Sequence, residues 1–196
     1  MNTISVTADR NYEVVIDIDW QKAIEPYLPN RGQVAVIVSE AMRDRIVNLP
    51  VTDAQIHVFT VPDSEAGKSF ATYQKVLDWL GAAGFTRNDL VIAVGGGAVT
   101  DLSGFVASSW LRCIDWVAVP TTLAAMVDAA VGGKTGINSE YGAITFNVGA
   151  GSHLAIAEKI LIPLTFKRVS LESIIRVQQR VLLDIAGRAQ RAASFQ

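Results

Sequence analysis

The sequence predicts an α/β fold, in which a Rossmann-like parallel sheet with flanking helices is followed by a helical tail. Three observations predict it. Up to about residue 138, short runs rich in Val and Ile alternate with longer segments of helical periodicity, which is typical of βαβ units. The runs at 34–38 and 90–94 are almost continuously apolar, as strands covered on both faces of a parallel sheet are. The second of these runs leads directly into three glycines at 95–97.

Five strands are expected, at residues 12–18, 34–38, 56–61, 90–94 and 116–119. A helix is expected from Ser69, a suitable N-cap, to Gly81, a suitable C-cap, because the apolar residues between them recur at helical spacing. In an open α/β sheet the ligand crevice lies at the carboxyl ends of the strands. We therefore expect the functional site in the loops after residues 38, 61, 94 and 119.

Composition excludes several classes of function. Half of the 196 residues are hydrophobic and the formal net charge is -2, which offers no attraction to nucleic acid. The single Cys113 excludes an internal disulfide, and with His57 and His153 it is too little for a closed zinc site of Cys and His. The amino terminus lacks the pattern of an export signal, and the apolar stretch at 90–99 is too short to cross a bilayer. We expect a cytoplasmic protein with no nucleic-acid or membrane partner.

The glycine triplet is the first candidate site. Backbone without side chains can approach a diphosphate closely, and the following helix would direct free N–H groups at it. A tight turn without a ligand is the alternative. The segment is not a G-x-G-x-x-G fingerprint, because residue 100 is Thr and an acidic residue about 20 positions on is missing. Asp101 could balance the helix dipole or bind a sugar hydroxyl.

Two further loops pair an acid with a base. After the strand at 116–119, Asp128 occupies the place of the first glycine of a Walker A loop, so a nucleotide-triphosphate loop is rejected. Lys134 then follows two glycines and could present its ammonium group to an anionic substrate. In the loop 62–68, Glu65 and Lys68 could bridge a ribose and a phosphate. In both loops the alternative is a solvated turn.

Together, the segments 62–69, 95–112 and 119–138 resemble the 3-dehydroquinate synthase family, which belongs to the sugar phosphate cyclases. The resemblance implies an amino-terminal domain that binds NAD and a divalent metal, zinc or cobalt, held by a Glu and two His of a carboxy-terminal domain. It implies conversion of a phosphorylated sugar acid, 3-deoxy-D-arabino-heptulosonate 7-phosphate, to 3-dehydroquinate. In that chemistry NAD oxidises a substrate hydroxyl, which acidifies the neighbouring C–H so that phosphate can leave, and the hydride is then returned.

The resemblance also implies roles for individual residues. Those implied to bind NAD are Glu40, Glu65, Lys68, Gly96, Gly97, Ala98, Asp101, Thr121, Thr122, Ala124 and Asp128. Of these, Glu40 matches the family's adenosine-ribose acid only loosely. Those implied in catalysis are Asp128 and Lys134, which would face the substrate, and Arg112, which would reach its phosphate, often across a homodimer interface.

The resemblance ends where Gly142 is followed by Ala and Ile instead of the family's Lys and Asn. We therefore expect an NAD-binding α/β domain at 1–141 and a divergent, mostly helical tail at 142–196, in which we identify no metal ligands. Two origins stay open: a truncated or frame-shifted synthase, or a rearranged gene whose new tail covers the cofactor domain. Two other functions also stay open, a non-catalytic NAD-binding or subunit-interaction module and a metal-dependent polyol dehydrogenase.

Overall fold

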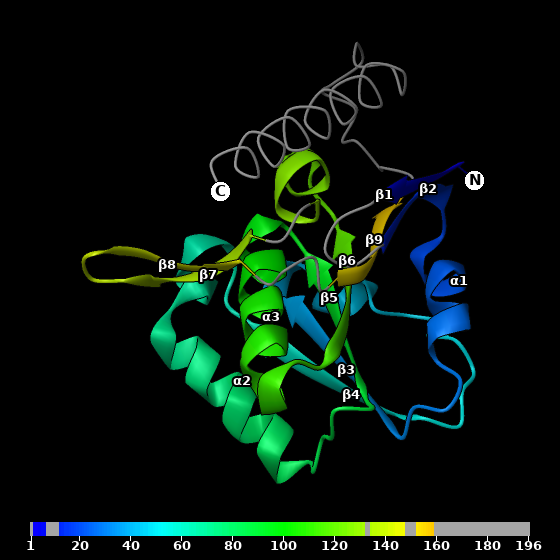
Figure 1. Cartoon of the computed structure of the whole chain (residues 1–196), viewed down its shortest axis with the longest axis horizontal. Helices are drawn as coiled ribbons and strands as arrows, with labels where there is room; N and C mark the ends of the chain where they lie inside the picture. The colour runs from blue at the N-terminus through cyan, green and yellow to red at the C-terminus, as the bar shows by residue number, and fades with distance from the viewer. Residues whose placement is uncertain (1, 7–11, 132–133, 148–151, 159–196) are drawn as a thin grey trace, which may run out of the picture.

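A seven-stranded sheet forms the centre of the molecule. The computed structural model describes residues 2–6, 12–131, 134–147 and 152–158 (Figure 1). The sheet contains β1 (Asn2–Val6), β2 (Tyr12–Ile18), β3 (Gln33–Ser39), β4 (Gln55–Val61), β5 (Leu90–Gly95), β6 (Asp115–Pro120) and β9 (Ser152–Glu158). Their order is β1-β2-β9-β6-β5-β3-β4, and all neighbours are parallel except β1 and β2. The α/β fold class and the five expected strands are confirmed.

Helices cover both faces of this sheet. The helices are α1 (Trp20–Ile24), α2 (Phe70–Ala82) and α3 (Gly97–Ser109), with short helical turns η1 (Glu25–Tyr27), η2 (Glu40–Arg45), η3 (Ser64–Lys68), η4 (Trp110–Arg112) and η5 (Ala125–Ala129). Side chains of α2 and α3 join one hydrophobic cluster, and side chains of α1 join a second one. No helix within the described residues is long and apolar enough to span a membrane.

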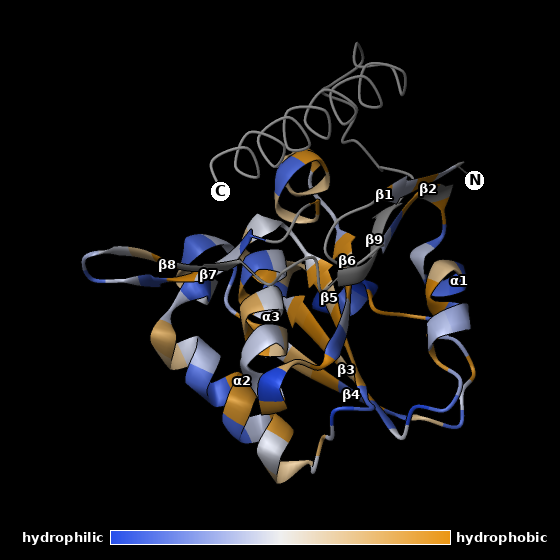
Figure 2. Cartoon of the chain, viewed as in Figure 1, coloured by the Kyte–Doolittle hydropathy of each residue, from blue (hydrophilic) through white to orange (hydrophobic). Residues whose placement is uncertain are grey.

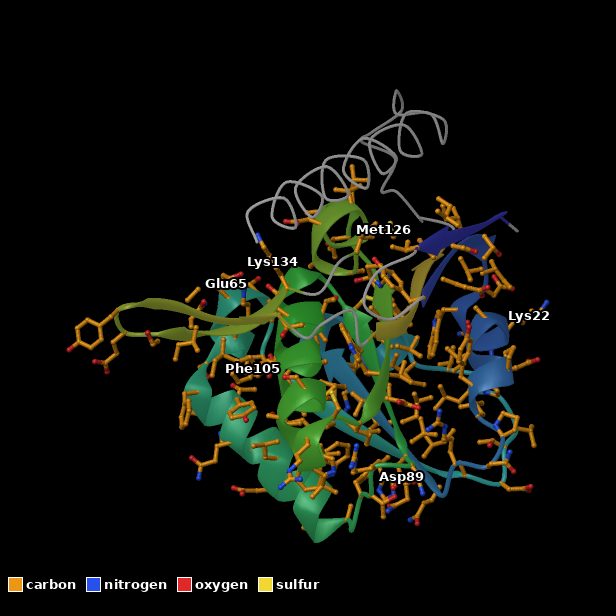
Figure 3. The ribbon with its side chains drawn as sticks, viewed as in Figure 1. Lys22, Glu65, Asp89, Phe105, Met126 and Lys134 are labelled. Carbon is orange, nitrogen blue, oxygen red and sulfur yellow. The ribbon has the colours of Figure 1, made fainter. Side chains whose placement is uncertain are left out.

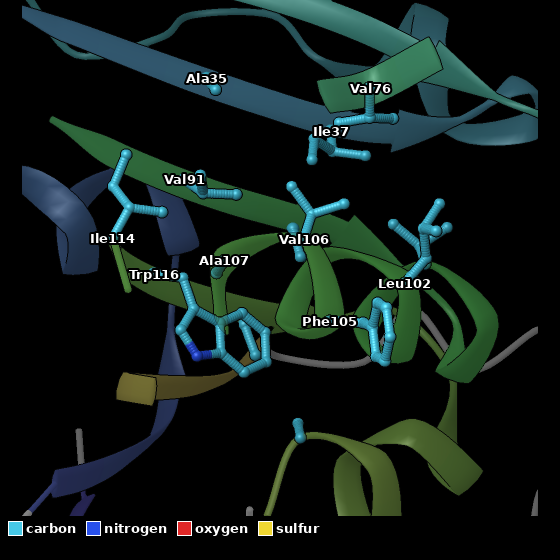
Figure 4. Close-up of a cluster of buried hydrophobic side chains, with 14 of the residues drawn as sticks. Ala35, Ile37, Val76, Val91, Leu102, Phe105, Val106, Ala107, Ile114 and Trp116 are labelled. Carbon is cyan, nitrogen blue, oxygen red and sulfur yellow. The ribbon is translucent and has the colours of Figure 1, made fainter. Parts of the chain in front are cut away.

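The two clusters arise from the alternation of side chains along the central strands. On β3, Ala35 and Ile37 belong to the α2/α3 cluster, whereas Val34, Val36 and Val38 belong to the α1 cluster. This is the period-two pattern of a strand buried on both faces. Figure 2 shows the hydrophobic colour concentrated on these central strands. Figure 4 shows side chains of β3, β5, β6, α2 and α3 meeting in the first cluster.

Helix α2 begins as the sequence predicts and ends later. The Ser69 side chain accepts a hydrogen bond from the backbone N–H of Thr72, so the expected N-cap is confirmed. The expected C-cap at Gly81 is wrong, because Gly81 lies inside the helix. Gly84 ends it, with φ +74, while the N–H of Phe85 bonds the carbonyl of Leu80 and that of Gly84 bonds Gly81. This pair of bonds is a Schellman motif, which favours glycine at the left-handed position.

Part of the segment assigned to the tail is strand. Residues Lys134–Ser139 and Gly142–Asn147 form a separate antiparallel hairpin, β7–β8, and β9 lies between β2 and β6 in the main sheet. The described part of 142–196 is therefore β structure, of which β9 joins the main sheet and β8 belongs to the separate hairpin. Residues 159–196 of the expected helical tail lie outside the described residues, and the division of the chain at residue 141 stays a prediction.

Candidate functional site

A cleft of about 800 Å³ lies at the carboxyl ends of β3, β4, β5 and β6. The loops after all four strands contribute to it, as the position rule for open α/β sheets predicts. It is lined by Ser39, Ala41, Met42, Asp63, Ser64, Glu65, Gly96, Gly97, Ala98, Val99, Asp101, Thr121, Thr122, Ala124, Ala125, Asp128 and Ala129. Most of the residues predicted to bind the cofactor are therefore brought together.

The glycine turn forms the floor between β5 and α3. Gly95 is buried at the end of β5, where a Cβ would come within 2.7 Å of Val99 Cγ2, so only glycine permits this close turn. Gly96 and Gly97 line the cleft. Within α3 the N–H of Thr100 bonds the carbonyl of Gly96 at 3.1 Å, which leaves the N–H groups of the three preceding residues without intrahelical acceptors. Such a helix start fits a diphosphate.

The opposite wall comes from the segment after β6. The N–H of Thr121 bonds the carbonyl of Gly95 at 2.9 Å, which holds this segment beside the glycine turn. The Thr122 hydroxyl accepts from the N–H of Ala125 at 3.3 Å, at the start of the π-helical turn η5. This turn carries Asp128 into the lining of the cleft. π-helical turns are rare and are frequent at functional sites.

The charged side chains of η3 and α3 beside the cleft form ion pairs with one another. Lys68 Nζ lies 2.8 Å from Asp101 Oδ2 and 3.8 Å from Glu65 Oε2. The Lys68 side chain is only 13% exposed and is not part of the lining. In this structure it therefore pairs with the Asp101 carboxylate and does not itself face the cleft. Burial raises the pKa of Asp101; the hydrogen bond and charge of Lys68 lower it, and the charges of Asp128 and Glu65 raise it again.

Besides Lys68, three predicted site residues lie outside the lining. Glu40 is exposed on η2, although its neighbours Ser39 and Ala41 line the cleft. Arg112 follows the far end of α3, and a helix of 13 residues spans roughly 20 Å, so it lies at the opposite end of this helix from the cleft. Lys134 is exposed at the start of β7, at the same end of the molecule as Glu65, whereas Asp89 lies at the other end (Figure 3).

One acidic residue of the lining was not among the predicted site residues. Asp63 follows β4, and its Oδ1 accepts a hydrogen bond from the N–H of Ala41 at 3.1 Å, which ties the loop after β4 to the loop after β3. Its position directly after a parallel strand is the signal by which it could have been found.

The described residues offer no ready metal centre. Among them no group of three or more His, Cys, Asp or Glu side chains could hold a metal ion. The acidic residues of the cleft are instead tied to Lys68 or distributed around the glycine turn. The described residues therefore fit a dinucleotide and do not fit the metal implied by the resemblance, so we assign no chemical step to a metal here.

Comparison with known proteins gives a consistent result. Residues 58–166 match the family described as 3-dehydroquinate synthase N-terminal. The 3-dehydroquinate synthase of Corynebacterium diphtheriae is 45% identical over 148 residues, covering 72% of this chain and 41% of the relative. The chain thus spans about 40% of the length of the curated relatives it matches.

Solved structures show the same fold. A 2-deoxy-scyllo-inosose synthase complexed with carbaglucose-6-phosphate, NAD+ and Co2+ superimposes with a TM-score of 0.70 at 24% identity, covering 80% of this chain and 46% of that chain. The 2-epi-5-epi-valiolone synthase of Streptomyces hygroscopicus, with NAD+ and Zn2+ bound, gives 0.67 at 26% identity, covering 79% and 45%.

Proposed function

Because the chain belongs to the 3-dehydroquinate synthase N-terminal family, we propose that it is the NAD-binding part of a 3-dehydroquinate synthase. One observation carries the proposal: four strand ends build a single cleft from a bare glycine turn, a helix start and a ring of acidic and hydroxyl side chains. The NAD+ in the two cyclase structures supports it, since both share this fold.

The proposed binding mode assigns the diphosphate to the free N–H groups at the start of α3. Asp101 and Glu65, held by Lys68, would bind ribose hydroxyls, because carboxylates accept hydrogen bonds from them. Thr121, Thr122 and Ala124 would line the adenine side. When bound, NAD would supply the hydride acceptor for oxidation of a substrate hydroxyl.

We further propose that Asp128 and Lys134 orient a phosphorylated sugar acid beside the nicotinamide. Lys134 is exposed, so its ammonium group is available to an anion. Arg112 would have to reach the substrate phosphate of a second copy, because it lies at the end of α3 away from the cleft. The homodimer is therefore part of this proposal.

Complete turnover is a separate proposal, because the chain spans about 40% of its curated relatives and its described residues lack a metal centre. We expect NAD binding with impaired phosphate release. A non-catalytic NAD-binding module is the second candidate, and the lack of a metal centre among the described residues favours it.

Two measurements test the proposal. Calorimetric titration with NAD should give saturable binding that Gly97→Val abolishes, because a branched side chain would project from the helix start that receives the diphosphate. Lys75→Ala, which removes an exposed charge from α2, should bind NAD as the unaltered chain does. Failure of the unaltered chain to bind NAD would refute the assignment of the cleft.

Phosphate release then separates the two candidates. The chain is incubated with 3-deoxy-D-arabino-heptulosonate 7-phosphate, NAD and zinc, and inorganic phosphate is measured. Release that depends on NAD and on Lys134 identifies a synthase. NAD binding without release identifies a binding module.

A further inference from the structure

The β7–β8 hairpin is attached to two elements that lie beside the cleft. Near the start of β7, Thr135 packs against Gly104 of α3, where a Cβ would overlap Thr135 Cγ2. Near the end of β7, Asn138 forms a parallel β-bridge with Ser69, the N-cap of α2. The hairpin is therefore held against α3 at one point and against the segment after η3 at another.

The side chain of Asn138 extends this attachment to a residue of the cleft. Its Nδ2 donates a hydrogen bond to Glu65 Oε2 at 2.7 Å. The same carboxylate oxygen lies 3.8 Å from Lys68 Nζ, which donates to Asp101 Oδ2 at 2.8 Å. These four residues form a polar bridge from β7 through η3 to α3, and two of them, Glu65 and Asp101, line the cleft.

Asn138 holds Glu65 more closely than Lys68 does. The Glu65 side chain is 70% exposed, and a glutamate this exposed moves among rotamers unless a partner fixes it. Lys68 is engaged by Asp101 at the shorter distance. Of these two partners, the amide of Asn138 therefore lies closer to the Glu65 carboxylate and sets its orientation at the rim.

The same strand carries Lys134. Thr135, Gly136 and Ile137 are buried, whereas Lys134 is exposed and Asn138 is half-buried. Because Lys134 and Asn138 are four residues apart, they lie on the same face of the strand. Four residues of extended chain separate Lys134 from Asn138 by roughly 13 Å. Fixing Asn138 therefore also limits where the backbone of Lys134 can lie.

We propose that Asn138 is a positioning residue that ties the β7–β8 hairpin, and with it Lys134, to the cleft by holding the Glu65 carboxylate. The effect on cofactor affinity rests on the proposed function; the tie between hairpin and loop does not.

The experiment compares Asn138→Ala, Asn138→Asp and the control Tyr141→Ala, which alters the exposed tip of the same hairpin. NAD affinity is measured by calorimetry. Asn138→Ala should weaken binding about three- to tenfold, which is the range for the loss of one ordinary hydrogen bond, because the Glu65 side chain is largely exposed to solvent. Tyr141→Ala should leave the affinity unchanged.

Two readouts separate positioning from a general structural effect. In a Glu65→Ala background, Asn138→Ala should weaken binding no further, because it acts through Glu65. Asn138→Asp should bind NAD most weakly at neutral pH, because it places a second carboxylate beside Glu65. Its affinity should approach that of Asn138→Ala as the pH falls, because two adjacent carboxylates then share a proton. A merely structural defect would show neither behaviour.

Hydrogen exchange tests the tie without cofactor. Amides of 62–69 and 134–139 should exchange faster in Asn138→Ala than in the unaltered chain and in Tyr141→Ala. If the unaltered chain binds NAD and Asn138→Ala stays within about twofold of it, the inference is overturned. If the unaltered chain does not bind NAD, the proposed function fails, and exchange alone decides: unchanged rates overturn the tie and faster rates in both segments support it.

Discussion

Replacing Lys68 by Met should destabilise the fold in a pH-dependent way. Lys68 and Asp101 are 2.8 Å apart, and their side chains are 13% and 23% exposed. The substitution keeps the length of the aliphatic stem and removes the ammonium group. Asp101 then keeps a mostly buried carboxylate beside the charges of Asp128 and Glu65.

The expected loss follows from how each contact is buried. The 3.8 Å contact with Glu65 joins a group that is 70% exposed, and such pairs contribute about 0–1 kcal/mol. Breaking a fully buried pair costs about 3–5 kcal/mol. Asp101 retains some exposure, so we expect a lower value for Lys68→Met, about 1–3 kcal/mol at neutral pH, which is the range for a buried group left without its partner.

The sign of the pH dependence follows from the pKa of Asp101. Burial already raises this pKa in the folded chain, and removal of Lys68 takes away both causes that lower it. A folded-state pKa above the unfolded value gives stability that is fully present below the unfolded pKa and is lost as the pH rises through the folded pKa. The penalty of Lys68→Met should therefore be smaller at about pH 4.5 than at about pH 7.5.

Urea unfolding followed by circular dichroism measures the penalty at both pH values. Asp101→Asn and the double variant Lys68→Met/Asp101→Asn complete a mutant cycle, in which the double variant should lose less than the sum of the single ones. A penalty that is equal at both pH values, or strictly additive losses, would show that the pair does not act as a buried ion pair.

Four further substitutions test the packing of the cleft, of α3 and of the opposite end of the domain. Gly95→Ala should lower the free energy of unfolding by about 1–3 kcal/mol, because its Cβ would meet Val99. In Gly97→Ala the Cβ would lie 3.6 Å from a neighbouring methyl group, so this variant should keep its fold and bind NAD more weakly in calorimetry. Equal stability of the two variants would contradict this reasoning. Gly104→Ala should destabilise to a similar extent in thermal unfolding, because its Cβ would overlap Thr135 and lie 3.0 Å from the Trp116 ring, and an unchanged midpoint would refute the close approach of β7. Asp89→Ala should cost about 1–3 kcal/mol in urea unfolding, because the part-buried N–H groups of Gln33 and Thr86 lose a charged acceptor 2.6–2.8 Å away; Asp78→Ala on an exposed face of α2 is the control.

Most of the central sheet could be predicted from sequence because its strands produce local patterns of apolar residues. The runs around 34–38 and 90–94 are apolar on both faces, and each is followed by a loop that a parallel crossover needs. Strands β1, β7, β8 and β9 were not among the five predicted strands. The pairing of β9 with β2 joins residues more than 130 positions apart, such as Glu13 and Leu154, and local periodicity contains no such information.

The candidate site shows the same division. The glycine turn and Asp128 could be found because residue type and position after a strand coincide, whereas Thr121 and Thr122 came from the family resemblance alone. Glu40 was selected on its position after β3, but the turn of η2 directs its neighbours to the cleft instead. Asn138 could not be found, since its contact with Glu65 depends on how the hairpin packs across 73 residues of sequence.

The place of β9 also has a consequence for synthesis of the chain. All four strands that build the cleft are complete by Pro120, yet β6 and β2 become neighbours only through Ser152–Glu158. A ribosome that releases the chain from the amino terminus therefore exposes two open strand edges until residues 152–158 emerge. During that interval a nascent chain has a nearly finished cleft but an unsealed sheet, whose open edges offer unpaired backbone groups to other chains.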